Sequence, residues 1–83
     1  MEITVKSNFL VFPVNSALEP AQMKFWDGDT VVYAPMVKLD AANPTVYAYL
    51  DVKRFWGKTL KITVEPETEI VCREADTIDI PDV

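Results

Sequence analysis

The chain has 83 residues, of which 49% are hydrophobic and 25% charged, and its formal net charge is −5. This length allows a single domain that buries roughly 60% of its unfolded surface, so a thin core is expected. The apolar fraction excludes a disordered chain. The longest apolar runs, 9–14 and 31–37, are far shorter than the roughly 20 residues of a transmembrane helix, which excludes a membrane span.

The negative charge is concentrated at the C-terminal end. Residues 65–83 hold seven acids and one base, Arg73, which gives −6, whereas residues 1–64 hold six acids and seven bases, which gives +1. Nucleic-acid binding needs clustered Lys and Arg, so this distribution argues against a nucleic-acid partner. The first residues lack the basic and apolar regions of a signal peptide, so the chain alone does not identify its compartment.

The first third of the chain predicts two strands and a loop. Ile3 and Val5 alternate with polar neighbours in 2–6, and a more apolar strand is expected over 8–14. Pro13 places the end of that second strand at a sheet edge or just beyond it. Residues 15–22 have no sustained period and include Pro20, so we expect a loop there, and we expect any helical turn of the chain to fall in it.

An Asp-Gly pair predicts a β-hairpin in the middle of the chain. Asp27-Gly28-Asp29 lies between β-rich runs at 23–26 and 30–39, which is a strong short-range hairpin signal. Pro35 lies inside the second arm and cannot donate to a ladder, so it indicates an edge strand or a bulge at which the arm changes direction. A loop is expected at 40–43.

Two further strands are predicted on either side of a compact connection at 53–58. Apolar and polar residues alternate over 46–52, with Tyr47 and Tyr49 on the face opposite the aliphatic residues, and again over 60–64. Gly57 can supply the positive φ that the connection needs. Residues 65–68 are expected to be a connector and 69–73 a short last strand.

These elements predict an all-β protein, a small antiparallel β-sandwich of jelly-roll-like form with six or seven short strands. The sandwich module is expected to span 1–73. Residues 74–83 are acidic and are interpreted as a linker toward a downstream domain.

The residues required by common catalytic and metal sites are missing. The chain has no His, one Cys and two Gly, which excludes Ser-His-Asp and Cys-His nucleophiles, zinc sites and a Gly-rich phosphate loop. Paired carboxylates remain, but the acids fall mostly in turns or in the acidic end. The sequence therefore predicts no catalytic residue, no metal, no cofactor and no enzyme activity, and Cys72 is expected to be a small buried hydrophobe.

The aromatic residues are the candidates for a binding site. Trp26, Tyr47, Tyr49 and Trp56 can expose their rings, and flat aromatic faces suit both sugar stacking and protein interfaces. Three interpretations stay open for them: packing within the module, contact with another domain, and binding of a sugar.

Three stretches together carry a family pattern: NFLVFPVN, MKFWDGDTVVY and VYAYLDVKRFWGKTLKITVE. They resemble the small N-terminal module, of undefined function, that precedes the catalytic domain in a subset of bacterial family 32 glycoside hydrolases, the levanase, inulinase and invertase group. That pattern runs as a YLxFPV strand, a D-G hairpin and an FLDVSxFKGKxLxIxV strand pair. The matching positions here are Phe9 to Val14, Asp27, Gly28, Leu50, Asp51, Val52, Phe55, Gly57, Lys58, Leu60, Ile62 and Val64. The chain departs from the pattern at Lys53, Arg54 and Trp56.

The resemblance implies a non-catalytic accessory module of a fructan-degrading glycoside hydrolase, packed against the downstream catalytic domain of the same polypeptide. The catalytic motifs of that family lie in a five-bladed propeller, so no catalytic residue carries over to this chain. An extracellular or periplasmic location is also implied. The alternative is an independent carbohydrate-binding module that takes fructan oligosaccharides on its exposed aromatics. A small self-contained enzyme is a third hypothesis, for which the needed side chains are missing.

Overall fold

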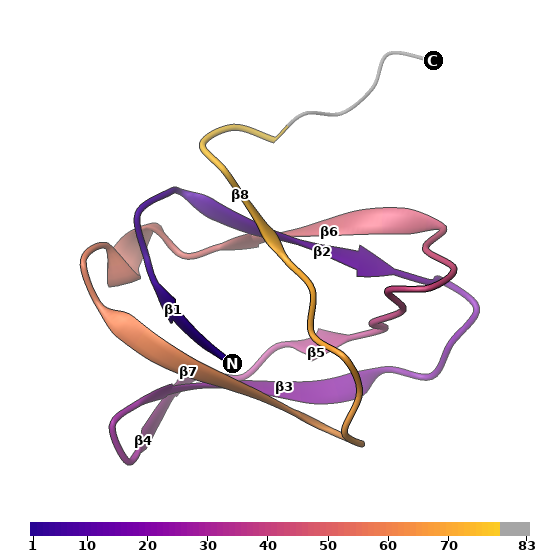
Figure 1. Ribbon diagram of the computed structural model, residues 1–83, viewed down its shortest axis with the longest axis horizontal. Helices are drawn as coiled ribbons and strands as arrows, with labels where there is room; N and C mark the ends of the chain where they lie inside the picture. The colour runs from indigo at the N-terminus through magenta and orange to yellow at the C-terminus, as the bar shows by residue number, and fades with distance from the viewer. Residues whose placement is uncertain (79–83) are drawn as a thin grey trace.

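The computed structural model describes residues 1–78 and confirms the all-β fold. Two antiparallel sheets face each other as a small sandwich, and Figure 1 shows them as an upper and a lower layer. In the large sheet the order is β1 (Glu2–Thr4), β7 (Thr59–Glu65), β3 (Ala21–Asp27) and β4 (Thr30–Tyr33), with β5 (Met36–Val37) also paired to β3. In the small sheet the order is β6 (Val46–Asp51), β2 (Phe9–Val14) and β8 (Arg73–Ala75).

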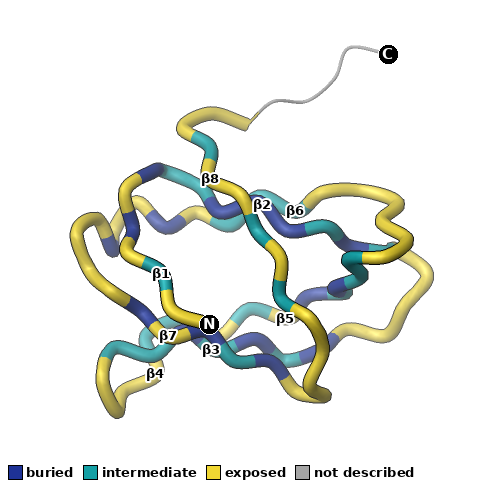
Figure 2. Tube along the Cα trace, viewed as in Figure 1, coloured by how far each residue is buried: buried dark blue, intermediate teal, exposed yellow. Residues whose placement is uncertain are grey.

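The core fills the space between the sheets, as the alternation of apolar residues predicts. Figure 2 shows the buried positions recurring along the strands of both layers. The largest side chains that are less than 2% exposed and face the opposite sheet are Leu10, Phe12, Met23, Phe25, Leu60 and Ile62. Since the pleat sends successive side chains to opposite faces, alternate residues of β2, of β7 and of β3 up to Phe25 belong to this core.

The predicted hairpin is confirmed, with Gly28 and Asp29 as its two loop residues. Asp27 of β3 pairs with Thr30 of β4, and Gly28 has φ +60°. Among residues 1–78 only glycines have positive φ, so Asp29 does not, which is the combination typical of a type II′ turn. Gly57 has φ +82°, as expected for the connection before β7.

Pro35 divides the second arm of the hairpin into β4 and β5, which is why residues 1–78 contain eight strands where six or seven were expected. Both strands pair with the edge of β3, as an edge position for Pro35 predicts. The Gln22 side-chain amide donates to the carbonyls of Ala34 (3.0 Å) and Pro35 (3.3 Å) across the break. Beyond β5, Leu39 bridges to Val14 of the small sheet, so the arm passes from one layer to the other.

The strands β6 and β7 lie in different sheets, although the sequence places them on either side of one short connection. β6 pairs with β2, whereas β7 pairs with β1 and β3. The connection therefore crosses between layers, and it contains the one helical turn of residues 1–78, the 3₁₀ turn η1 (Lys53–Phe55). The expectation that any helical turn falls in the loop at 15–22 was wrong; that loop holds a turn in which the amide of Leu18 donates to the carbonyl of Asn15.

The last strand lies further along the chain than expected. β8 begins at Arg73, so the predicted strand at 69–73 is displaced, and pairing with β2 continues to Ala75. Two residues assigned to the linker, Glu74 and Ala75, are thus in a sheet. The rest of the linker assignment falls partly on 79–83, which lie outside the described residues, and it stays a prediction.

Candidate interaction surface

The outward side chains of β6, β2 and β8 form one surface, the small-sheet face, made of Phe9, Val11, Pro13, Tyr47, Tyr49 and Arg73. Their grouping follows from register, because residues opposite each other on antiparallel strands share a face. Val11 lies opposite Tyr49 on one side and Arg73 on the other, and Pro13 lies opposite Tyr47. Tyr47 and Tyr49 thus occupy the face opposite the core, as the alternation in 46–52 predicts.

Arg73 joins the two tyrosines. Its guanidinium carbon lies 6.0 Å from the ring centroid of Tyr47 and 5.9 Å from that of Tyr49, and a guanidinium nitrogen donates to the Tyr49 hydroxyl at 3.3 Å. Val11 is only 1% exposed although it points away from the core cluster. The aromatic and guanidinium groups therefore build a second, small packed cluster on the outside of the sheet.

The small-sheet face continues toward the start of β2, at Phe9. The rings of Phe9 and Tyr49 meet edge to face, with centroids 6.3 Å apart, and the ammonium of Lys53 lies 5.4 Å from the Phe9 centroid. Lys53 also pairs with Asp51 at 3.5 Å. This ion pair is largely exposed, so it positions the ammonium and contributes little stability.

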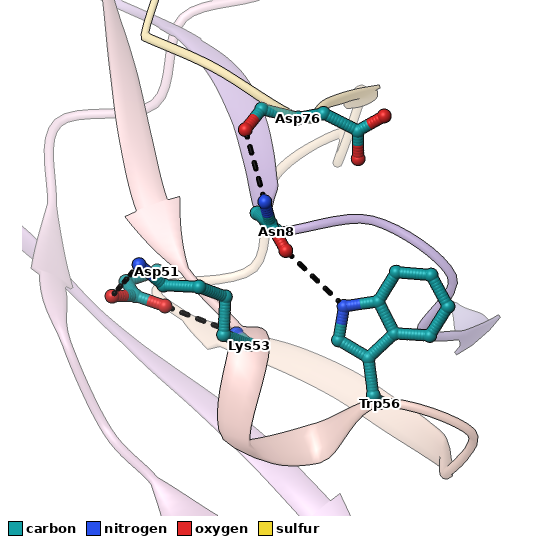
Figure 3. A network of polar contacts seen from close by, with 5 residues as sticks. All are labelled: Asn8, Asp51, Lys53, Trp56 and Asp76. Atoms are coloured by element: carbon teal, nitrogen blue, oxygen red, sulfur yellow. Dashed lines mark hydrogen bonds and ion pairs between the residues drawn. The ribbon is translucent and has the colours of Figure 1, made fainter.

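Trp56 borders this end of the face. Figure 3 shows the Asn8 side chain between two partners: its amide nitrogen donates to the Asp76 carbonyl at 3.0 Å, and its oxygen accepts from the Trp56 indole N–H at 3.3 Å. The indole N–H is thus fixed, while the Trp56 side chain stays 56% exposed. Asn8, which precedes β2, is thus hydrogen-bonded both to Asp76, which follows β8, and to Trp56, which follows η1.

Trp26 lies on the other sheet, apart from the remaining three aromatics. It alternates with the core residues of β3, and its indole N–H donates to the Thr63 hydroxyl at 2.9 Å across to β7. A hollow of about 280 Å³ lies beside it, lined also by Lys61. The sequence-based candidates are therefore separated: Tyr47 and Tyr49 lie on the outer face of the small sheet, Trp26 lies on the large sheet, and Trp56 lies in the connection between the layers, hydrogen-bonded to Asn8.

A second hollow of about 220 Å³ opens beside β8. Its lining is mostly apolar and consists of Val11, Pro13, Ala41, Pro44, Tyr47, Val71, Cys72 and Arg73. Tyr47 is 53% exposed and Val71 44% exposed, so this rim presents apolar surface to solvent. Sequence reasoning missed the hollow because its lining comes from four separate segments. Its one sequence signal was Arg73, the single base of the acidic end.

Two ionisable groups near this surface are perturbed. Burial raises the pKa of the Cys72 thiol, and the negative charge of Glu74 raises it further. The backbone N–H of Asn43 donates to the Asp40 carboxylate and lowers its pKa, assisted by the Asn15 side chain and by the Ala42 backbone N–H. The hydrogen bonds of the Asp40 carboxylate hold the loop at 40–43 in place.

Within residues 1–78 no group of three or more potential metal ligands comes together. No helix in this part of the chain is long and apolar enough to cross a membrane. Cys72 packs against the core but is only partly buried, where a buried position was expected.

No protein-family model, no curated protein and no solved structure matches this chain. The resemblance to the accessory module of family 32 glycoside hydrolases therefore rests on the three sequence stretches alone.

Proposed function

We propose that this chain is a non-catalytic docking module, the accessory β-sandwich of a fructan-degrading glycoside hydrolase, and that its small-sheet face packs against the catalytic domain. The observation that carries the proposal is the exposed apolar surface at and beside this face. Tyr47 on this face, Val71 in the hollow beside it and Trp56 near its border are each between 44% and 56% exposed. Aromatic residues on a firm sheet are the side chains enriched at protein interfaces.

The rigidity of the small-sheet face supports the same conclusion. The rings are held by cross-strand neighbours, by Arg73 and by the Asn8 amide, so little side-chain entropy remains to be lost on docking. The three sequence stretches supply the identity of the partner, because the family they resemble carries such a module beside its propeller.

The test is a titration of the ¹⁵N-labelled chain with the purified catalytic domain of a levanase. The two tryptophans give two indole N–H signals with different partners, Asn8 for Trp56 and Thr63 of the large sheet for Trp26, so each serves as the control for the other. We expect the Trp56 indole and the amides of Tyr47 and Arg73 to shift or broaden, while the Trp26 indole keeps its position. Perturbation centred on Trp26, or none at millimolar partner, would overturn the proposal.

A second candidate is an independent carbohydrate-binding module, favoured by the exposed Tyr47 ring at the rim of a hollow. The ring offers a stacking platform for the CH surface of a sugar. Inulin and levan oligosaccharides would then change the fluorescence of the Trp26→Phe variant, which keeps Trp56 as its reporter. The Trp56→Phe variant, which reports only from the opposite sheet, should not respond.

A further inference from the structure

The hollow beside β8 exists because two segments cover different parts of one edge of β2. β8 pairs with residues of β2 up to Val11, and Leu39 forms an isolated bridge with Val14. No residue of either segment is therefore the register partner of Pro13. Pro13 has no N–H, and its carbonyl accepts from the Asp40 amide at 3.1 Å. The gap in the sheet edge therefore has no unpaired backbone group at Pro13, and a side chain can enter it without burying such a group.

The chemistry of the lining selects between possible occupants. Valine, alanine and proline side chains form most of the wall, and Arg73 is the one cation at the rim. Such a wall suits an aliphatic side chain. A sugar placed against it would lose the hydrogen bonds of its hydroxyls to water and gain few in return.

Arg73 is positioned to receive a negative charge. Its guanidinium is held between Tyr47 and Tyr49, yet it forms no ion pair with any acid in residues 1–78. The adjacent Glu74 lies opposite Leu10 of β2, a core residue, and so alternates to the other face. An arginine fork that is already oriented binds a carboxylate through charge-assisted hydrogen bonds at a low entropic cost.

We infer that the hollow and Arg73 together form a subsite for a peptide segment of the docking partner, one that carries an aliphatic side chain next to a carboxylate. This inference rests on the proposed function and specifies its partner surface as apolar and acidic. The aliphatic side chain would occupy the hollow between Pro13, Pro44 and Val71, and the carboxylate would pair with Arg73.

The test uses the protein's own thiol. Cys72 lines the hollow, and it is the one cysteine of the chain, so occupancy of the hollow should protect it from alkylation by iodoacetamide. The probe is the blocked peptide acetyl-Ile-Asp-Val-amide, and its matched control is acetyl-Ile-Asn-Val-amide. We expect the aspartyl peptide to slow alkylation about tenfold at about ten times its dissociation constant.

The asparaginyl peptide should need about tenfold more peptide for the same protection, because it cannot form a charge-assisted pair with Arg73. In the Arg73→Gln variant the two peptides should protect Cys72 at equal concentrations. The Arg73→Lys variant should keep only part of the difference between the two peptides. Each variant is compared with its own rate without peptide. Equal protection by both peptides in the native chain overturns the role of the carboxylate, and no protection by either overturns the subsite.

The tryptophan titration separates this inference from the function on which it rests. A Trp56 response to the catalytic domain without protection of Cys72 by the aspartyl peptide overturns the subsite alone. If neither Trp56 nor Cys72 responds, both proposals fall.

Discussion

Cys72 is a thiol whose reactivity is set by its position between the core and the hollow. It packs against the core cluster, and burial raises the pKa of the thiol, with Glu74 adding to the effect. Because only the thiolate is a nucleophile, the raised pKa makes Cys72 slow to react at neutral pH.

Alkylation of the folded chain should therefore rise at a higher pH than alkylation of the same chain in urea.

The folded state also keeps the Cys72 proton to higher pH than the unfolded state does. The protonated Cys72 thiol therefore contributes stability that is fully present below the pKa of Cys72 in the unfolded chain. This contribution is lost as pH rises through the pKa of Cys72 in the folded chain. Urea unfolding of the native chain and Cys72→Ala from neutral to alkaline pH should show this loss in the native chain only, and parallel curves would contradict it.

The pKa of Asp40 is shifted in the opposite direction to that of Cys72. Its carboxylate accepts from the amides of Asn43 at 2.9 Å and Ala42 at 3.0 Å, and the Asn43 bond is the main reason for its lowered pKa. A lowered folded pKa gives stability that is present above the unfolded pKa and is lost as pH falls through the folded value.

We expect Asp40→Asn, which keeps the acceptor oxygen and removes the charge, to lower the urea midpoint at neutral pH. The difference from the native chain should shrink as pH falls through and below the ordinary aspartate range. Chemical denaturation at a series of pH values measures this. A difference that stays constant with pH would show that the charge of Asp40 has no part in holding the loop.

At the scale of single elements, turn chemistry explains where the strands begin and end. The β3–β4 hairpin turns at Gly28, where the positive φ admits glycine far more readily than other residues. Nothing lies within 4 Å of a Cβ placed there, so a substitution would be resisted by the backbone alone.

Gly28→Ala should lower the free energy of unfolding by about 1–2 kcal/mol, the cost of placing an L-residue in the left-handed region. The matched control is Asp29→Ala at the neighbouring loop position, which lacks positive φ and should change stability by less than about 0.5 kcal/mol. Urea unfolding followed by circular dichroism compares the two. Equal losses would show that the turn conformation is not what the hairpin depends on.

At the scale of the whole molecule, the sandwich depends on a thin core that two sheets share. Phe12 of the small sheet and Phe25 of the large sheet are both fully buried within it. Small domains have total stabilities of only about 5–15 kcal/mol, so one large cavity removes much of the margin. The outer cluster around Tyr47 is packed on one side only and should matter far less for folding.

Phe12→Ala should therefore cost about 3–5 kcal/mol, whereas Tyr47→Ala should cost less than about 1 kcal/mol. Thermal unfolding of both variants measures the contrast. A Tyr47→Ala variant as unstable as Phe12→Ala would assign the exposed ring to folding and leave the docking proposal without its main support.

Much of this architecture follows from local pattern. Alternation of apolar residues predicts the strands, because the pleat has a period of two, and it also predicts that Tyr47 and Tyr49 turn away from the core. Asp27-Gly28 predicts the hairpin and Pro35 the edge position, because turn geometry and the missing N–H are properties of those residues themselves. The absence of histidine, which excludes Ser-His-Asp and Cys-His nucleophiles, is likewise read directly from the sequence.

Which strands become neighbours was decided only by the tertiary structure. The connection at 53–58 does not show that β6 and β7 belong to different sheets, since a short crossing and a hairpin can use similar turn residues. The displaced start of β8 depends on its pairing with β2. In that pairing Phe9 lies opposite Ala75, which is more than sixty positions later in the chain. The hollow and the place of Arg73 depend on that same pairing. They arise from contacts between distant segments, which no local sequence pattern encodes.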